Sequence, residues 1–124
     1  MDGDGDVDVV VASEFDNTIA WYPNDGNGSF SAGNKVISTL ALSPRMIEVA
    51  DMEGDGDLDL VSASVDDGKI ALYVNDGAGT FAAQRELATL GQALAVHATD
   101  LDGDGALDVL FSSRNPDEIG WIRQ

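Results

Sequence analysis

Three short acidic segments recur along the chain at intervals of about 50 residues, and each alternates aspartate with glycine. They span Asp2–Asp8, Asp51–Asp59 and Asp100–Asp108, and none of them contains a basic residue. Like charges a few ångströms apart repel by about 1 kcal/mol per pair even in water, so compact segments of this kind are costly unless a cation neutralises them. The repeat therefore constrains the fold, which must be built from recurring units, and also the chemistry of those units.

Two interpretations of the acidic segments compete. They could be solvated turns that keep the protein soluble, or they could be loops that bind a cation. Alternate residues of a tight loop can turn their oxygens inward, and the interspersed glycines allow the bends, so the spacing favours cation binding. The oxygen donors, with no cysteine and one histidine in the chain, disfavour zinc and copper. Flexible, carboxylate-rich loops suit Ca²⁺ better than Mg²⁺, and we expect two to three calcium ions per chain.

The segments are not EF-hand loops. An EF-hand ends with a bidentate acid at its twelfth position, and counting from Asp51 and Asp100 places Ser62 and Phe111 there. The residues that follow are short apolar runs of the kind found in strands rather than an exiting helix.

The acidic segments belong to a longer repeat. Residues 3–30 match residues 54–81 without gaps at more than half of their positions, and residues 103–124 match residues 54–75. The middle copy predicts four strands separated by Asp-Gly and Asn-Asp-Gly turns, at Met46–Ala50, Leu58–Ser64, Lys69–Asn75 and Phe81–Thr89. Four antiparallel strands per repeat are typical of a propeller blade.

The sequence therefore predicts an all-β fold of β-propeller blades, with ten strands, or about two and a half blades, in a single segment spanning residues 1–124. The repeats are expected at about 1–50, 51–99 and 100–124. The first copy is expected to lack its inner strand and the last its outer strand. Exposed sheet edges and blade faces favour association, so we expect a homo-oligomer, with the ring completed by further copies or by missing sequence.

The chain resembles the FG-GAP and VCBS-type repeats. Their D-x-D-x-D-G-x-x-D pattern is similar to the loops at Asp51–Asp59 and Asp100–Asp108, and the segments Ile19–Gly26 and Ile70–Gly77 resemble the strand and turn that follow. The family includes integrin α-subunit propellers, bacterial surface proteins and some propeller lectins. The resemblance implies that calcium is bound in the hairpin between the first and second strands of each blade.

The resemblance also implies a ligand set for each loop. The second loop is expected to use the side chains of Asp51, Glu53, Asp55 and Asp59 with the backbone carbonyl of Asp57. The third loop is expected to use the side chains of Asp100, Asp102, Asp104 and Asp108 with the carbonyl of Ala106. The first loop offers Asp2, Asp4 and Asp8 with the carbonyl of Asp6, and it lacks the aspartate expected before Met1, so it should be the weakest site. Glu53 is one methylene longer than the usual ligand and could act through water.

Composition excludes several classes of protein. Apolar residues make up 44% of the chain, too many for a disordered acidic tail. Six Lys and Arg residues against 23 Asp and Glu residues give a net charge of −17, which would repel nucleic acid. No apolar run is long enough to span a membrane. No signal peptide follows Met1, so an extracellular or cell-surface location is expected from the resemblance alone.

We expect a non-catalytic, calcium-stabilised scaffold for protein or glycan binding. One alternative is a lectin-like propeller that stacks sugars on Trp21, Tyr22 or Trp121, although packing is favoured for Trp21 and Trp121 because Leu72 takes their place in the middle copy. The other alternative is a fragment of a propeller enzyme. The sequence offers little for catalysis, because His97 is the single histidine and no Gly-x-Ser-x-Gly motif is present.

Overall fold

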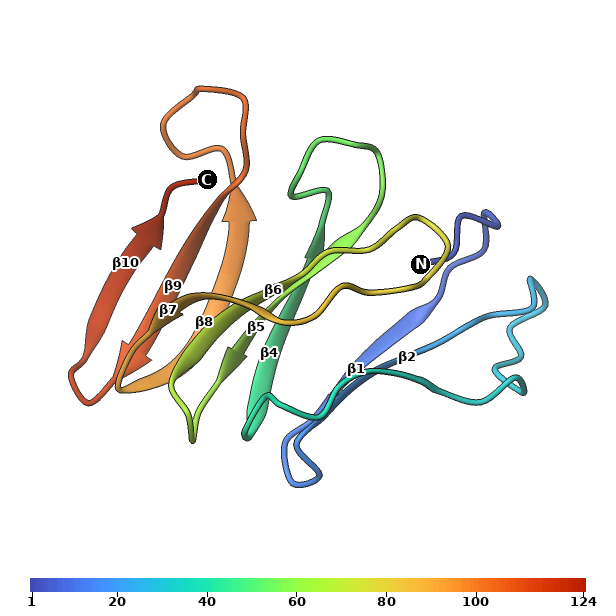
Figure 1. Cartoon of the computed structure of the whole chain (residues 1–124), viewed down its shortest axis with the longest axis horizontal. Coiled ribbons are helices and arrows are strands. Elements are labelled where there is room, and N and C mark those ends of the chain that lie inside the picture. The colour runs from blue at the N-terminus through green and yellow to red at the C-terminus, as the bar shows by residue number, and fades with distance from the viewer.

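The computed structural model describes residues 1–124 and contains ten strands and no helix (Figure 1). The strands are β1 (Val9–Ser13), β2 (Thr18–Tyr22), β3 (Lys35–Ser38), β4 (Pro44–Ala50), β5 (Asp59–Ser64), β6 (Lys69–Tyr73), β7 (Arg85–Thr89), β8 (Gln92–Thr99), β9 (Asp108–Arg114) and β10 (Glu118–Ile122). The predicted all-β fold with ten strands is confirmed.

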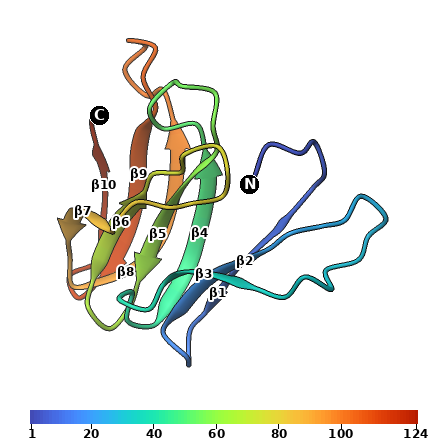
Figure 2. The same ribbon diagram turned by 45° about the vertical axis from the view of Figure 1, so that its right-hand side comes forward.

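The strands form three antiparallel sheets that follow one another along the chain. The first sheet has the order β1-β2-β3, the second β4-β5-β6-β7 and the third β8-β9-β10. The second sheet lies between the other two, and the three do not close into a ring (Figures 1 and 2). Figure 2 shows that the first sheet splays away from the second toward the end that carries the acidic loops.

The middle sheet is buried on both faces, which explains why its central strand reads as a continuous run of small and apolar residues. All six residues of β5 are buried. Because neighbouring side chains of a strand point to opposite faces, Leu60 packs in the cluster shared with the first sheet and Val61 packs in the cluster shared with the third. Each cluster joins two consecutive repeats, so the sheets are held together by apolar contact.

One predicted strand is shorter than the sequence indicated. The fourth strand of the middle repeat begins at Arg85, not at Phe81. Residues 75–84 instead form a loop, in which Asp76 Oδ1 accepts hydrogen bonds from the backbone N–H groups of Ala78 and Thr80, both at 3.0 Å. These bonds curl the backbone, and Phe81 retains only an isolated bridge to Asn75. The other three predicted strands of this repeat agree with the structure within two residues.

Candidate metal centre

The three acidic loops share one backbone conformation. The second loop connects β4 to β5 and the third connects β8 to β9, while the first precedes β1. Gly54 and Gly56 of the second loop have φ angles of 72° and 95°, and the matching glycines of the other two loops take similar values. Side chains with a Cβ rarely adopt such angles, so the glycines at these places permit the predicted bends.

The last aspartate of the second loop fastens the loop to the sheet. Asp59 has no exposed surface. Its Oδ2 accepts a hydrogen bond from the N–H of Met52 at the start of the loop, and its Oδ1 accepts one from the N–H of Asn75 just after β6, both at 2.9 Å. No basic side chain pairs with this carboxylate, so its charge is balanced only by backbone dipoles.

The last aspartate of the third loop makes the same pair of hydrogen bonds. Asp108 is also completely buried, and it accepts hydrogen bonds from the N–H groups of Leu101 and Gln124 at 3.1 and 3.2 Å. A buried carboxylate without a cationic partner is unfavourable, so a cation placed beside it would lower the free energy of the folded state.

In the first loop, the last aspartate is held in the same way, but one of its two donors is charged. Asp8 accepts a hydrogen bond from the N–H of Asn24 at 2.9 Å, and the amino group of Met1 pairs with its second oxygen. Burial acts to raise the pKa of Asp8, but the ammonium group and the Asn24 N–H outweigh it and hold this pKa below its ordinary value. The Met1 amine takes the place that the Met52 N–H has in the second loop.

Three carboxylates come together in the third loop. Oxygens of Asp100, Asp102 and Asp108 lie within 4.8 Å of one another, and no such trio forms in the first or second loop. All of the donors are hard oxygens, which suit a divalent cation such as Ca²⁺ or Mg²⁺. The residues present therefore fit a metal ion, and the full ligand sets remain predictions.

Arg123 contacts two of the predicted ligands in the third loop. Its Nε lies 3.0 Å from Asp102 Oδ2, and its Nη2 lies 2.6 Å from Asp104 Oδ2. The bond from Arg123, together with one from the Ala106 N–H to Asp104 Oδ1 at 3.0 Å, lowers the pKa of Asp104. Sequence reasoning missed Arg123 because Val74 stands at its place in the middle repeat. A basic residue just after the last strand was the signal available in the sequence.

The carboxylates of the second loop do not form such a trio. Asp51 turns its two oxygens toward the N–H groups of Asp55 and Gly56, at 3.1 and 3.0 Å. Asp55 accepts a hydrogen bond from the N–H of Asp57 at 3.0 Å. Glu53 Oε1 lies 4.0 Å from Arg85 Nη1 in an ion pair at the surface.

The two aspartates expected to act through their carbonyls lie against neighbouring turns. A Cβ added at Gly77 would meet a carboxylate oxygen of Asp57 at 2.5 Å, and one at Gly26 would meet Asp6 at 2.7 Å. Only glycine leaves room for these side chains. Ala106 occupies the matching place in the third loop without any carboxylate.

The first loop contains one unpaired polar atom. Asp2 Oδ1 is buried and has no hydrogen-bond partner, whereas Asp4 Oδ1 accepts a bond from the N–H of Asp6 at 2.9 Å. Buried carboxylate oxygens without a donor are uncommon. This atom is therefore available to a cation.

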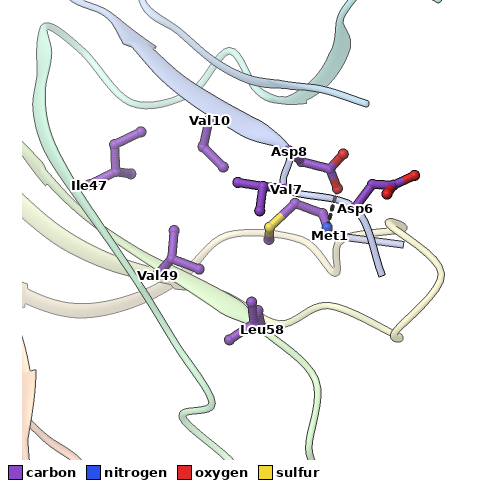
Figure 3. Close-up of a pocket in the computed structure, with 8 residues that line it drawn as sticks. All are labelled: Met1, Asp6, Val7, Asp8, Val10, Ile47, Val49 and Leu58. Carbon is purple, nitrogen blue, oxygen red and sulfur yellow. Dashed lines mark hydrogen bonds and ion pairs between the residues drawn. The ribbon is translucent and has the colours of Figure 1, made fainter. Parts of the chain in front are cut away.

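A cavity of about 430 Å³ lies between β1 and β4, beside the first loop (Figure 3). Most of its lining is aliphatic, and it carries no aromatic ring on which a sugar could stack; the lining residues are Met1, Asp6, Val7, Asp8, Val10, Ile47, Val49 and Leu58. Trp21, one of the proposed stacking residues, is completely buried, with Lys35 Nζ 4.5 Å from its ring centre. The packing role expected for Trp21 is confirmed.

Three consecutive antiparallel sheets, each with an acidic loop at the same place, define an all-β repeat protein. The FG-GAP-like repeat family matches the chain twice, at residues 1–62 and 51–111, and the chain belongs to this family. The comparisons found no curated protein and no solved structure that matches it. The structure has no helix that could span a membrane.

Proposed function

We propose that this chain is a non-catalytic, calcium-binding β-propeller module that acts as a scaffold for protein or glycan binding. The observation that carries the proposal is the convergence of Asp100, Asp102 and Asp108 within 4.8 Å, in a loop whose backbone conformation recurs in all three repeats. Membership of the FG-GAP-like repeat family supports the propeller architecture. So does the packing of three successive sheets through two apolar clusters.

The aspartates within each loop have two different roles. The buried aspartates, Asp59 and Asp108, hold the loop against the sheet through backbone N–H groups. The more exposed carboxylates nearer the start of each loop bind the ion, together with Asp108 in the third loop. A bound calcium ion supplies positive charge that offsets the repulsion among them. Calcium that binds the folded loops but not the unfolded chain would stabilise the fold.

Calcium is favoured over other ions by the donor set and by the setting. The loops offer only oxygen ligands, and they are flexible and rich in carboxylates. FG-GAP repeats are typical of extracellular proteins, where calcium is present at millimolar concentration. We propose an extracellular or cell-surface location on this ground.

The two alternative functions have less support. The enzyme alternative would need a reactive centre, yet His97 is exposed and lies 3.0 Å from the carboxylate of Glu48, outside the acidic loops. Trp21 is buried in the core and is not accessible to a sugar. Of the residues proposed for sugar stacking in the lectin alternative, Trp121 is 44% exposed and Tyr22 is half-buried. A glycan array with the calcium-loaded protein would test it directly.

The proposal is tested by thermal unfolding of the intact chain in calcium and in a chelator. Calcium should raise the melting temperature of the wild type, and the double variant Asp55→Ala with Asp104→Ala should lose most of that increase. Asp117→Ala, which removes an exposed carboxylate outside the three loops, is the matched control and should keep the full increase. An equal calcium effect in the double variant would contradict the ligand assignment.

A further inference from the structure

The two terminal sheets each present an exposed apolar face. On the third sheet, Ile119 is 84% exposed and Trp121 is 44% exposed. On the first sheet, Val9 is 42% exposed, and Phe30, in the loop before β3, is 38% exposed. Groups of exposed apolar side chains of this kind mark interaction surfaces.

The face of the third sheet matches a face that is buried inside the chain. Ile119 and Trp121 occupy the repeat positions of Ile70 and Leu72. Both of these middle-sheet residues are completely buried in the cluster shared with the following sheet. The third sheet is therefore built to pack against a following sheet of the same repeat.

The face of the first sheet matches the opposite side of the same interface. Val9 and Phe30 occupy the repeat positions of Leu60 and Phe81. Leu60 is completely buried, and Phe81 packs beside it in the cluster shared with the preceding sheet. The first sheet is therefore built to receive a preceding sheet. The two exposed faces therefore correspond to the two sides of one interface between consecutive sheets, which we call a joint.

The internal joint between the first and second sheets shows what that joint contains. The ring of Trp21 lies directly over Gly79, where an added Cβ would come within 2.4 Å of the ring. Across the same joint, Asn75 Nδ2 donates to the backbone carbonyl of Met1 at 2.8 Å, and it also donates to the carbonyl of Leu58 at 3.2 Å.

The exposed faces of the first and third sheets carry the corresponding residues, but these residues lack the contacts seen in the internal joint. Trp121 corresponds to Trp21, and Gly28 corresponds to Gly79, yet nothing lies within 4 Å of a Cβ placed at Gly28. Asn24 corresponds to Asn75, but its Nδ2 donates only to the carbonyl of Val7, at 3.1 Å. The carbonyl of Leu101 stands at the repeat position of the Met1 carbonyl.

We propose that a second copy of this chain docks head-to-tail, with the third sheet of one copy packed on the first sheet of the other. Trp121 then covers Gly28 of the second copy, and the Leu101 carbonyl accepts a hydrogen bond from Asn24 Nδ2. The inference rests on the propeller architecture proposed above. Two copies supply six sheets, which lies within the four to eight blades of closed propellers, and two such joints close the ring.

Charge sets the conditions under which the copies join. Each chain has a net charge of −17, so two copies repel one another at low ionic strength. Calcium bound in the loops and added salt both weaken this repulsion. The dimer should therefore be most stable when calcium and physiological salt are both present.

The experiment is size-exclusion chromatography with light scattering on the intact chain in calcium. The wild type should have twice the 13.0 kDa mass of one chain. Ile119→Glu breaks one face and Val9→Glu breaks the other, so each variant alone should be monomeric. Mixed in equal amounts, they should form a heterodimer through the one joint whose two faces are both intact. Phe15→Glu adds the same charge at a 97% exposed turn residue and should remain dimeric.

Three outcomes would overturn the proposal: a monomeric wild type, a dimer that survives either single substitution, or a mixture that stays monomeric. A monomeric wild type would leave both faces for other repeats of a longer polypeptide. Calcium-dependent thermal stabilisation is measured on the same samples. Its retention in monomeric protein separates failure of the docking proposal from failure of the proposed calcium-binding function.

Discussion

The carboxylate of Asp59 accepts a hydrogen bond from the backbone N–H of Asn75 at 2.9 Å, across 16 positions of the chain. The bond joins the end of the acidic loop to a residue two positions after the end of β6. A second bond, from the Met52 N–H, joins the same carboxylate to the start of the loop. The two bonds make Asp59 a structural element of the fold in addition to any part it has in metal binding.

Asp59→Ala should destabilise the protein whether or not calcium is present. The substitution leaves two buried N–H groups without an acceptor, at a cost of about 2–5 kcal/mol in the free energy of unfolding. Urea denaturation in a chelator measures this loss. Asp55→Ala is the matched comparison, because it should lower stability mainly in calcium. Equal effects of the two substitutions in the chelator would contradict the structural role of Asp59.

Arg123→Gln should tighten calcium binding at the third loop several-fold. The guanidinium of Arg123 pairs with Asp102 and Asp104, so a divalent cation must displace it or bind against its charge. Glutamine keeps much of the side-chain length without the charge. Isothermal titration calorimetry at fixed ionic strength measures the change, with Arg114→Gln as a control outside the loops. Weaker calcium binding in Arg123→Gln would show that the arginine supports the site.

The repeat made the fold predictable to a large degree. Alternation of apolar residues and turn signals located the strands, and equivalence between copies predicted their number. The start of β7 was misplaced because Asp76 caps the preceding loop with hydrogen bonds to Ala78 and Thr80. A pattern of apolar residues does not contain that local competition between side chain and backbone.

The candidate site was predictable in outline but not in its partners. The spacing of the carboxylates indicated which residues belong to each loop. It did not indicate that Arg123 would reach two of them, since this contact depends on how β10 ends. Nor did repeat equivalence reveal that Trp21 is buried while Trp121 is exposed, because the difference lies in whether a neighbouring sheet is present.

Gly79→Ala should destabilise the fold more than Gly28→Ala. Both glycines have similar φ angles, 76° and 80°, so the backbone strain of an added Cβ is nearly the same. Only at Gly79 does the Cβ meet the buried Trp21 ring, which adds about 1–3 kcal/mol of overpacking. Thermal unfolding in an Ile119→Glu background keeps contacts between copies out of the comparison. Equal destabilisation would show that the ring moves aside freely.

Alkaline pH should destabilise the protein through Tyr73. Burial raises the pKa of Tyr73 above its ordinary value of 10.0, against the smaller opposing effect of Ser62 and Ser38. The unfolded chain then releases this proton first, so the contribution is fully present below pH 10.0 and is lost as pH rises through the folded-state pKa. Denaturant unfolding as a function of pH should show a smaller alkaline loss in Tyr73→Phe than in the wild type. The half-buried Tyr22, changed to Phe, is the control, and an unchanged profile in Tyr73→Phe would contradict the assignment.

The most direct test of the calcium assignment is native mass spectrometry of the intact chain, prepared in calcium and again after chelation. The account predicts two to three calcium ions per chain in the first sample and none in the second. The double variant Asp55→Ala with Asp104→Ala should retain at most one ion. A wild-type chain that binds no calcium at millimolar concentration would contradict the central claim.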